Sequence, residues 1–166
     1  MKEYKSFTLL SDELEGQCPM KHVFKNEELH GENISPQLSW VNAPEGTESF
    51  ALTVYDPDAP TGSGWWHWII FDIPAETTSL ESDAGNLRKK IAPAMSIQSL
   101  NDYLTHGYGG PCPPKGDKPH RYIFTIHALN TRSIGLSKDA NPALVGFVLN
   151  QYTIAKASLI TYFGRK

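Results

Sequence analysis

Residues 55–71 read Tyr-Asp-Pro-Asp-Ala-Pro-Thr-Gly-Ser-Gly-Trp-Trp-His-Trp-Ile-Ile-Phe, and they decide the fold because they join two apolar segments through a turn rich in proline and glycine. Apolar side chains alternate with period two over residues 49–55, which predicts a half-buried strand that enters the turn. Residues 65–73 are apolar on both faces apart from His67 and one aspartate, which predicts a central strand of a two-layer β protein. A proline follows and ends that strand.

The turn places two carboxylates at the end of the first strand and an imidazole near the start of the next. Asp56 precedes Pro57, which biases the backbone of Asp56 toward extended geometry. Prolines restrict the unfolded chain, so less entropy is lost on folding and the carboxylates of Asp56 and Asp58 are expected to point in fixed directions. Aspartate is also a common turn residue, so a rigid connection without function fits this stretch as well as a site does.

Composition indicates one globular domain. The 166 residues are 40% hydrophobic and 20% charged, which suits a single domain with a real core over residues 1–166. The net charge of −3 and one short basic cluster, Arg88-Lys89-Lys90, predict no nucleic-acid partner. No run approaches the roughly 18 apolar residues of a membrane span, and the N-terminus lacks the apolar core of a signal peptide. We therefore expect a cytoplasmic protein without a membrane span.

The two cysteines, Cys18 and Cys112, both lie next to proline and fit a reducing compartment. Whether they pair stays open, because a disulfide requires a geometry that sequence does not show. The chain has no Cys-x-x-Cys pair, which argues against a structural zinc site.

Short apolar segments separated by turn residues predict the remaining elements. Further strands are expected at residues 6–10, 37–41, 122–129 and 152–163, and residues 155–158 also suit a helix. Asn141 as N-cap and Pro142 in the first turn predict a helix over residues 143–151. Residues 76–90 read as a long connection, and residues 92–108 are mixed. About six or seven strands with Pro/Gly turns favour a mainly β fold, an antiparallel β-sandwich with one or two short helices.

A second loop carries the other half of a candidate site. Glycine and proline dominate residues 107–119, so regular structure is excluded there. Glycines allow close approach of a backbone, and exposed N–H groups in such a loop can hold an anion. His120 and Tyr122 open the strand that follows, just as His67 opens an earlier one. Polar side chains at strand ends beside rigid loops are the usual place for a site on a β scaffold.

Several motifs, in order along the chain, carry a family resemblance. They are Asp56-Pro-Asp-Ala-Pro, Trp65-Trp-His67, Gly110-Pro-Cys-Pro-Pro-Lys-Gly and Pro119-His-Arg-Tyr. They resemble the phosphatidylethanolamine-binding protein family, which includes Raf kinase inhibitor protein. Three further segments are similar to its bacterial YbhB/YbcL-like branch: Gly31-Glu-Asn-Ile-Ser-Pro-Gln-Leu-Ser-Trp, Gly107-Tyr-Gly-Gly-Pro-Cys-Pro-Pro and Ala155-Lys-Ala-Ser-Leu-Ile-Thr-Tyr-Phe-Gly-Arg. The resemblance spans nearly the whole chain and implies a β-sandwich with a small pocket for phosphoryl-like anions.

Carried over by motif, the resemblance implies a ligand-binding set and a pocket wall. The ligand-binding set is Asp56, His67, the backbone N–H of Cys112, His120 and Tyr122. The wall is Ala59, Pro60, Trp65, Gly110 and Pro113. The resemblance also implies a cis bond before Pro60 and a homodimer. Two departures from the family pattern are the missing C-terminal helix of animal members and residues 103–106, which differ from the expected glycine-containing lip.

The resemblance implies a non-enzymatic binding module without a cofactor. The expected ligand is a phosphate- or phosphoethanolamine-like anion, from a phospholipid headgroup or a phosphorylated residue. The expected protein partner is a protein kinase or another signalling protein. Asp56 would orient a histidine, and a protonated imidazole would strengthen anion binding. Arg121 would point away from the pocket, because neighbours on a strand alternate faces, and would brace Asp58.

The same residues leave an enzymatic alternative open. Taken singly, His67 or His120 is more often a core residue than a ligand. Together with Asp56 and Asp58 they have the donor types of a zinc site or of a site for a harder divalent ion. Cys112 beside His120 has the composition of a thiol–imidazole nucleophile pair. A metal- or thiol-dependent hydrolase is therefore the alternative function.

Overall fold

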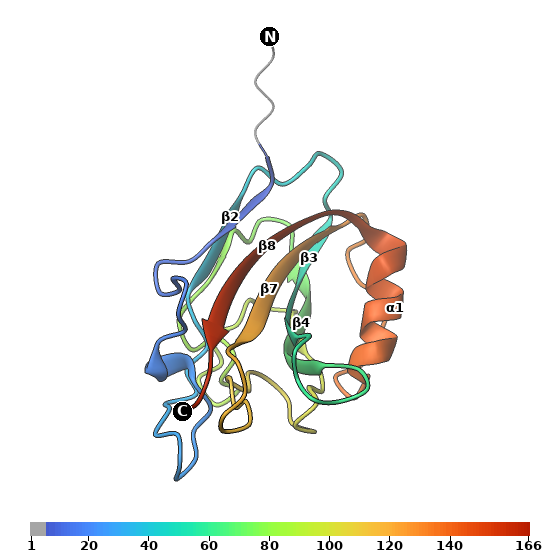
Figure 1. Cartoon of the computed structure of the whole chain (residues 1–166). Helices are drawn as coiled ribbons and strands as arrows, with labels where there is room; N and C mark the ends of the chain where they lie inside the picture. The colour runs from blue at the N-terminus through green and yellow to red at the C-terminus, as the bar shows by residue number, and fades with distance from the viewer. Residues whose placement is uncertain (1–5) are drawn as a thin grey trace.

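The computed structural model describes residues 6–166 as two antiparallel β-sheets and one α-helix (Figure 1). The smaller sheet has the order β1-β2-β5, with β1 at Thr8–Leu10, β2 at Leu38–Val41 and β5 at Ser79–Leu80. The larger sheet has the order β6-β4-β3-β7-β8, with β6 at Ile97–Gln98, β4 at Trp65–Pro74, β3 at Ser49–Asp56, β7 at His120–Leu129 and β8 at Thr153–Phe163. Residues 1–5 of the predicted domain lie outside the described residues. The predicted antiparallel sandwich is confirmed.

The long strands lie where the sequence predicted them, and two short strands lie where none was predicted. β5 falls in the segment read as a long connection, and β6 falls in the mixed segment. Each has 2 residues, which is too short to show a period in the sequence. A short 3₁₀ helix at Met20–His22 was also not predicted. The helical alternative for residues 155–158 is wrong, because these residues pair with β7 one by one, from Ala128↔Ala155 to Thr125↔Ser158.

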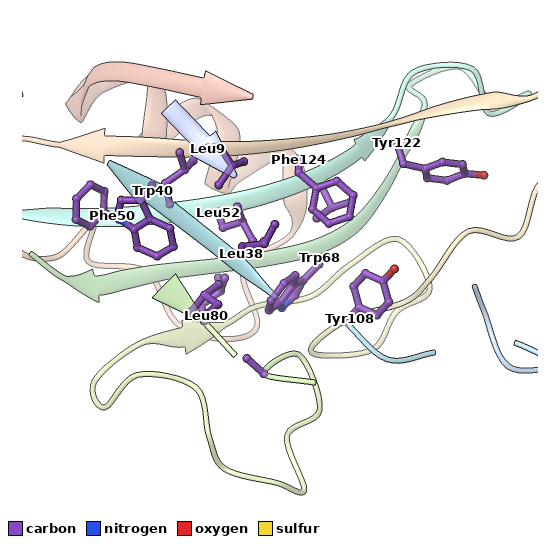
Figure 2. Packing of buried hydrophobic residues seen from close by; sticks show 14 of the residues in the cluster. Leu9, Leu38, Trp40, Phe50, Leu52, Trp68, Leu80, Tyr108, Tyr122 and Phe124 are labelled. Carbon is purple, nitrogen blue, oxygen red and sulfur yellow. The ribbon is translucent and has the colours of Figure 1, made fainter. Parts of the chain in front are cut away.

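The main core lies between the two sheets (Figure 2). Its large side chains are Leu9, Leu38, Trp40 and Leu80 from the smaller sheet and Phe50, Leu52, Trp68 and Phe124 from the larger one. Burying one such side chain stabilises the fold by roughly 1.5–3 kcal/mol. This core therefore holds β3, β4 and β7 in a fixed register, and with them the strand ends that carry the predicted site.

The other face of the larger sheet is covered by α1, Pro142–Tyr152, so the helix and β2 lie on opposite sides of that sheet (Figure 1). The buried helix residues Val145 and Leu149 share a cluster with Ala51, Ile69 and Phe71 of the sheet. At 11 residues α1 is the longest helix described, and within residues 6–166 no helix has the length and apolar character needed to cross a bilayer.

The start of α1 gives a prediction for stability. Asn141 Oδ1 accepts a hydrogen bond from the Leu144 N–H at 2.9 Å, which confirms the predicted N-cap. We expect Asn141→Ala to lower the free energy of unfolding by about 1 kcal/mol, because one helix donor loses its partner. Asn150→Ala is the matched control: Asn150 is exposed inside the same helix, where alanine is the better helix former. Urea unfolding measures both, and equal effects would contradict the capping role.

Candidate functional site

A cavity of about 300 Å³ opens where β3 ends and where β4 and β7 begin. It is lined by Asp56, Ala59, Pro60, Thr61, Trp65, His67, Tyr103, Cys112, Pro113, Pro114, His120 and Tyr122. The fold thus brings together the predicted ligand-binding set and most of the predicted wall, from three strands and two loops. Of the predicted residues, only Gly110 is not among the lining residues. Thr61, Tyr103 and Pro114 were not predicted.

The carboxylate of Asp56 organises the turn that follows β3. This residue is 3% exposed, and its Oδ1 accepts hydrogen bonds from the N–H groups of Asp58 at 2.8 Å and Ala59 at 3.1 Å. The Thr61 N–H donates to the Ala59 carbonyl at 2.7 Å, which closes a tight turn around Pro60. All peptide bonds within residues 6–166 are trans, so the predicted cis bond before Pro60 is wrong. The local hydrogen bonds of Asp56 and Thr61 shape the turn without a cis peptide bond.

The other oxygen of Asp56 orients His120, as predicted. His120 Nδ1 donates to Asp56 Oδ2 at 2.8 Å, and both side chains are buried. His120 Nε2 lies 3.4 Å from Oδ2 of Asp117, so both ring nitrogens face carboxylate oxygens. With the two backbone donors of the turn, the Asp56 carboxylate has three hydrogen bonds, which offset part of the cost of burying a charge. The pair also ties the end of β3 to the start of β7.

His67 reaches the cavity because β4 is irregular at this residue. Trp68 pairs with Val54 and Trp66 pairs with Tyr55, so one residue of β4 has no partner between two consecutive residues of β3. Trp68 packs between the sheets, whereas Trp66 packs with the cluster on the opposite face, so the alternation of faces is broken at His67. Such a bulge re-aims a side chain, and bulges are frequent beside functional sites.

The glycine loop holds the His67 ring in one tautomer. Nδ1 donates to the Gly109 carbonyl at 2.7 Å, and the Gly109 N–H donates back to the His67 carbonyl at 2.9 Å. Nε2 is buried and has no hydrogen-bond partner in the described part of the chain. Burial lowers the pKa of His67 to about 4, although the Gly109 carbonyl and the Asp56 carboxylate act in the opposite direction. The imidazole is therefore neutral near pH 7, so His67 is not the protonated imidazole that was expected to strengthen anion binding.

Two further buried polar groups of the cavity wall lack a partner within residues 6–166, the hydroxyl of Tyr122 and Nε1–H of Trp65. Burial raises the pKa of Tyr122 well above its usual range, so this hydroxyl keeps its proton and can donate. Figure 2 shows Tyr122 beyond Phe124, at the end of the core. An unpaired buried donor costs about 1–3 kcal/mol, so its presence is explained where a ligand completes the pairing.

The segment Pro111-Cys-Pro-Pro, which contributes to the cavity lining, has a single backbone donor. Proline has no N–H, so Cys112 carries the only one, and no group in the described part of the chain accepts it. Burial raises the pKa of the Cys112 thiol, whose Sγ lies 3.8 Å from Nδ2 of Asn26. Cys18 and Cys112 are both free thiols. A protonated thiol without an adjacent base is a weak nucleophile.

Gly110 supports this loop from behind the cavity. A Cβ at this residue would lie 2.2 Å from the His22 carbonyl oxygen and 2.7 Å from the Phe24 nitrogen, a distance that no side chain tolerates. The Gly110 N–H donates to Asn33 Oδ1 at 2.7 Å, and Asn33 Nδ2 donates to the Tyr108 carbonyl at 3.0 Å. The N–H of Gly110 is therefore used inside the protein, and its role is close backbone packing, not that of a wall residue.

Tyr103 is the largest of the three wall residues that the sequence did not predict. Its ring stacks on Phe24 with a centroid distance of 4.8 Å and meets Trp65 edge-on at 5.3 Å. Its hydroxyl donates to the Gly110 carbonyl at 2.9 Å. Tyr103 lies in a segment without periodicity, so the only sequence signal was that residues 103–106 differ from the family pattern.

Arg121 braces Asp58 outside the cavity, as predicted. Its Nε and Nη2 donate to the two carboxylate oxygens at 2.9 Å and 3.0 Å, and its backbone N–H donates at 2.9 Å. These hydrogen bonds hold the pKa of the Asp58 carboxyl well below its usual range. The Asp58 carboxylate is thus paired with Arg121 and is not a lining group of the cavity. Within residues 6–166 no group of three His, Cys, Asp or Glu side chains is arranged to hold a metal ion.

The fold and the site together define a β-sandwich protein with a small pocket of acid, imidazole and phenol groups at its strand ends. The family model "Phosphatidylethanolamine-binding protein" matches residues 13–164. The chain therefore belongs to the phosphatidylethanolamine-binding protein family, as its motifs predicted.

The relatives confirm the predicted branch of the family. YbcL of Escherichia coli K12 is 48% identical over 156 residues, which are 93% of this chain and 85% of that protein. YbhB of the same organism is 43% identical over 157 residues, 93% of this chain and 98% of that protein. A crystal structure of E. coli YbcL, described as a new member of the mammalian PEBP family, superposes with a TM-score of 0.93 at 47% identity and covers 96% of this chain and 99% of that one. The structure of the PEBP homologue CT736 of Chlamydia trachomatis superposes with a TM-score of 0.79 at 26% identity, and the match covers 97% of this chain and 99% of that one.

The buried histidines link stability to pH. Burial lowers the pKa of both His67 and His127 to about 4, from an ordinary value of 6.5. Between these values the unfolded state binds more protons than the folded state, so the free energy of unfolding should fall as the pH drops from 6.5 toward 4. The expected loss is on the order of 3 kcal/mol per ring. Urea unfolding across this range measures it, and His127→Gln should remove part of the slope; an unchanged slope would contradict the assignment.

The close packing of Gly110 gives a second prediction. We expect Gly110→Ala to destabilise the fold by at least about 1–3 kcal/mol, because the added methyl group meets backbone atoms that cannot yield. Gly146→Ala is the matched control: Gly146 lies in α1 with nothing within 4 Å of an added Cβ, so alanine should stabilise the helix by roughly 0.5–1 kcal/mol. Urea unfolding of both variants is the measurement, and two similar shifts would refute the packing role.

Proposed function

We propose that the cavity binds a small phosphoryl-type anion, such as phosphate or a phosphoethanolamine-like group, and that the protein is a non-enzymatic binding module. One observation carries this proposal: Tyr122, Trp65 and His67 all line a single cavity of about 300 Å³, and each has a buried polar atom without a partner in the described part of the chain. The N–H of Cys112, another lining residue, has no acceptor in the described part of the chain and is a further donor. Hydroxyl, indole and amide donors are the partners that an oxyanion accepts. Membership of a family named for phosphatidylethanolamine binding supports the same ligand chemistry.

The chemistry of the cavity favours binding over turnover. Burial raises the pKa of the Cys112 thiol, and the side chain that contacts its Sγ is Asn26, not a histidine. The imidazole of His120 is occupied by carboxylates instead of a nucleophile. The carboxylate of Asp58 is held by Arg121. The hydrolase alternative therefore lacks an activated nucleophile and a metal-binding group in the described part of the chain.

The proposed biological source of the anion is a phospholipid headgroup or a phosphorylated residue. The resemblance to Raf kinase inhibitor protein makes a kinase or another signalling protein the partner to test. A cytoplasmic location and a homodimer stay predictions. The free thiols of Cys18 and Cys112 suit a reducing compartment, and burial raises the pKa of Cys18 to about 12.

Removing the hydroxyl of Tyr122 tests the proposal. We expect inorganic phosphate and phosphoethanolamine to bind in titration calorimetry near pH 6, and Tyr122→Phe to weaken both by about tenfold, because one hydrogen bond worth roughly 1–1.5 kcal/mol is lost. Tyr162→Phe is the matched control: Tyr162 is 44% exposed on β8 and does not line the cavity, so its loss should leave affinity unchanged.

Two results would contradict the proposal. No binding of either compound to the folded protein would show that the cavity is not an anion site. Release of inorganic phosphate from phosphoethanolamine by the intact chain, abolished by Cys112→Ala or by a chelator, would support the hydrolase alternative instead.

A further inference from the structure

We propose that the outer edge of β6 is a docking site for an extended peptide, which adds to the larger sheet as a short strand and in which acidic side chains alternate with apolar ones. The inference goes beyond the proposed function, because the cleft along this edge shares no lining residue with the strand-end cavity.

The first observation is a cleft of about 520 Å³ beside β6. Ile97 and Gln98 of this strand contribute to its lining, and so does Lys138. The other lining residues come from the connection before β6: Ala84, Asn86, Leu87, Lys90, Ala92, Pro93 and Ser96. The Leu100 N–H donates to the Lys138 carbonyl at 3.1 Å, so a neighbouring segment already pairs with the chain just after β6. At Gln98 itself, no segment within residues 6–166 continues that pairing on the outer side of the sheet.

The second observation is that the backbone of Gln98 faces away from β4. The Ser99 N–H donates to the Ile69 carbonyl at 3.1 Å, so these two residues form a hydrogen-bonded pair. Gln98 stands opposite Ile70, which is the next pair along the ladder. Hydrogen-bonded pairs alternate with non-hydrogen-bonded ones in an antiparallel ladder, so the N–H and C=O of Gln98 point outward. They are the donor and acceptor that an added strand uses.

The side chain of Gln98 holds the cleft in shape. Its Oε1 accepts a hydrogen bond from Trp68 Nε1 at 2.8 Å, and its Nε2 donates to the Ala84 carbonyl at 2.9 Å. The chain beyond Ala84 is turned by its own hydrogen bonds, such as that from the Asn86 N–H to the Asp83 carbonyl at 3.0 Å. A binding edge that is fixed in advance loses less entropy when a partner docks.

The charges of the lining favour an acidic partner. Lys90 and Lys138 are exposed, and neither lies within ion-pair distance of a carboxylate in the described part of the chain. The carboxylates nearest to them along the chain, those of Asp83 and Asp139, are engaged by other basic side chains. Among the described residues that line the cleft there is no aspartate or glutamate. Complementary charge on a partner would therefore fix its register against this edge.

The apolar part of the lining favours an apolar side chain beside the acidic ones. Leu87 lines the cleft and is 46% exposed, and Ala84, Ala92 and Pro93 line it as well. The basic cluster Arg88-Lys89-Lys90, which the sequence alone left without a role, thus borders an apolar cleft. A cleft with both apolar residues and lysines suits a peptide in which apolar and acidic side chains alternate.

The probe is the capped peptide acetyl-Asp-Val-Asp-Leu-Asp-amide, and acetyl-Lys-Val-Lys-Leu-Lys-amide is the control for charge. We expect titration calorimetry to show saturable binding of the acidic peptide alone, and salt should weaken it because the ion pairs are exposed. Lys90→Glu combined with Lys138→Glu should weaken binding by about tenfold. Lys156→Glu is the matched control: Lys156 is exposed on β8, at the opposite edge of the same sheet, so affinity should stay unchanged.

Two N-methylated forms of the acidic peptide test whether it docks as a strand. Successive N–H groups of a strand point to opposite edges, so methylation of the valine and leucine nitrogens blocks one edge and methylation of the aspartate nitrogens blocks the other. Docking against Gln98 uses one edge, so one form alone should lose affinity, by about fivefold. In hydrogen exchange, the Gln98 amide should be protected by the bound peptide, and the amides of β8 should keep their rates.

The outcomes separate this inference from the proposed function. Failure of the acidic peptide to bind, or equal effects of the two N-methylated forms, would overturn strand addition at β6 and leave the anion cavity untouched. Loss of affinity in Lys156→Glu with no loss in the double variant would place the peptide on β8 instead. Competition between the peptide and inorganic phosphate would show that the peptide occupies the strand-end cavity, which would also overturn the inference.

Discussion

The hydrogen bonds of the buried Asp56 carboxylate are the constraint on which the functional end of this sandwich depends. A carboxyl group that is 3% exposed needs hydrogen-bond partners inside the protein, and here two backbone N–H groups and His120 Nδ1 provide them. One oxygen shapes the turn after β3 and the other fixes the histidine that opens β7. The two halves of the cavity, 64 residues apart in the chain, are thereby held in one arrangement.

A second constraint works against stability. The bulge of β4 and the hydrogen bond to Gly109 bury the His67 ring in a neutral form, and the lining residues Tyr122 and Trp65 each have a buried polar group without a partner within residues 6–166. Each such group costs roughly 1–3 kcal/mol when left unpaired. The well-packed core between the sheets makes these costs tolerable. A bound ligand that pairs with these groups would remove the cost, and this is the physical basis of the binding function that we propose for the cavity.

The sequence predicted the sandwich, the capped helix and most of the cavity because those features rest on local signals. Period-two alternation predicted β3, and the Asn141-Pro142 pair predicted α1. The motifs around Asp56, His67 and His120 predicted the candidate ligand-binding residues, which line the cavity. The missed features depend on tertiary contacts. β5 and β6 form only because a neighbouring strand offers an edge, and Tyr103 reaches the wall through its stacking on Phe24. The role of Gly110 could not be predicted from sequence, because it depends on the His22 backbone, whose carbonyl oxygen would lie 2.2 Å from an added Cβ.

The absence of lysine and arginine from the described lining residues limits how the anion that we propose as ligand could be recognised. A cationic site attracts any anion over a distance, and its affinity falls with salt. The lining holds neutral donors, the neutral imidazole of His67 and the carboxyl group of Asp56, so the proposed anion would be held by hydrogen bonds at contact. Such a site gains little from charge alone, and hydrogen bonds of about 0.5–1.5 kcal/mol each sum to modest affinity for a small anion. Tight binding of a macromolecule would therefore depend on surface outside the cavity, with the phosphoryl group deciding which partners fit.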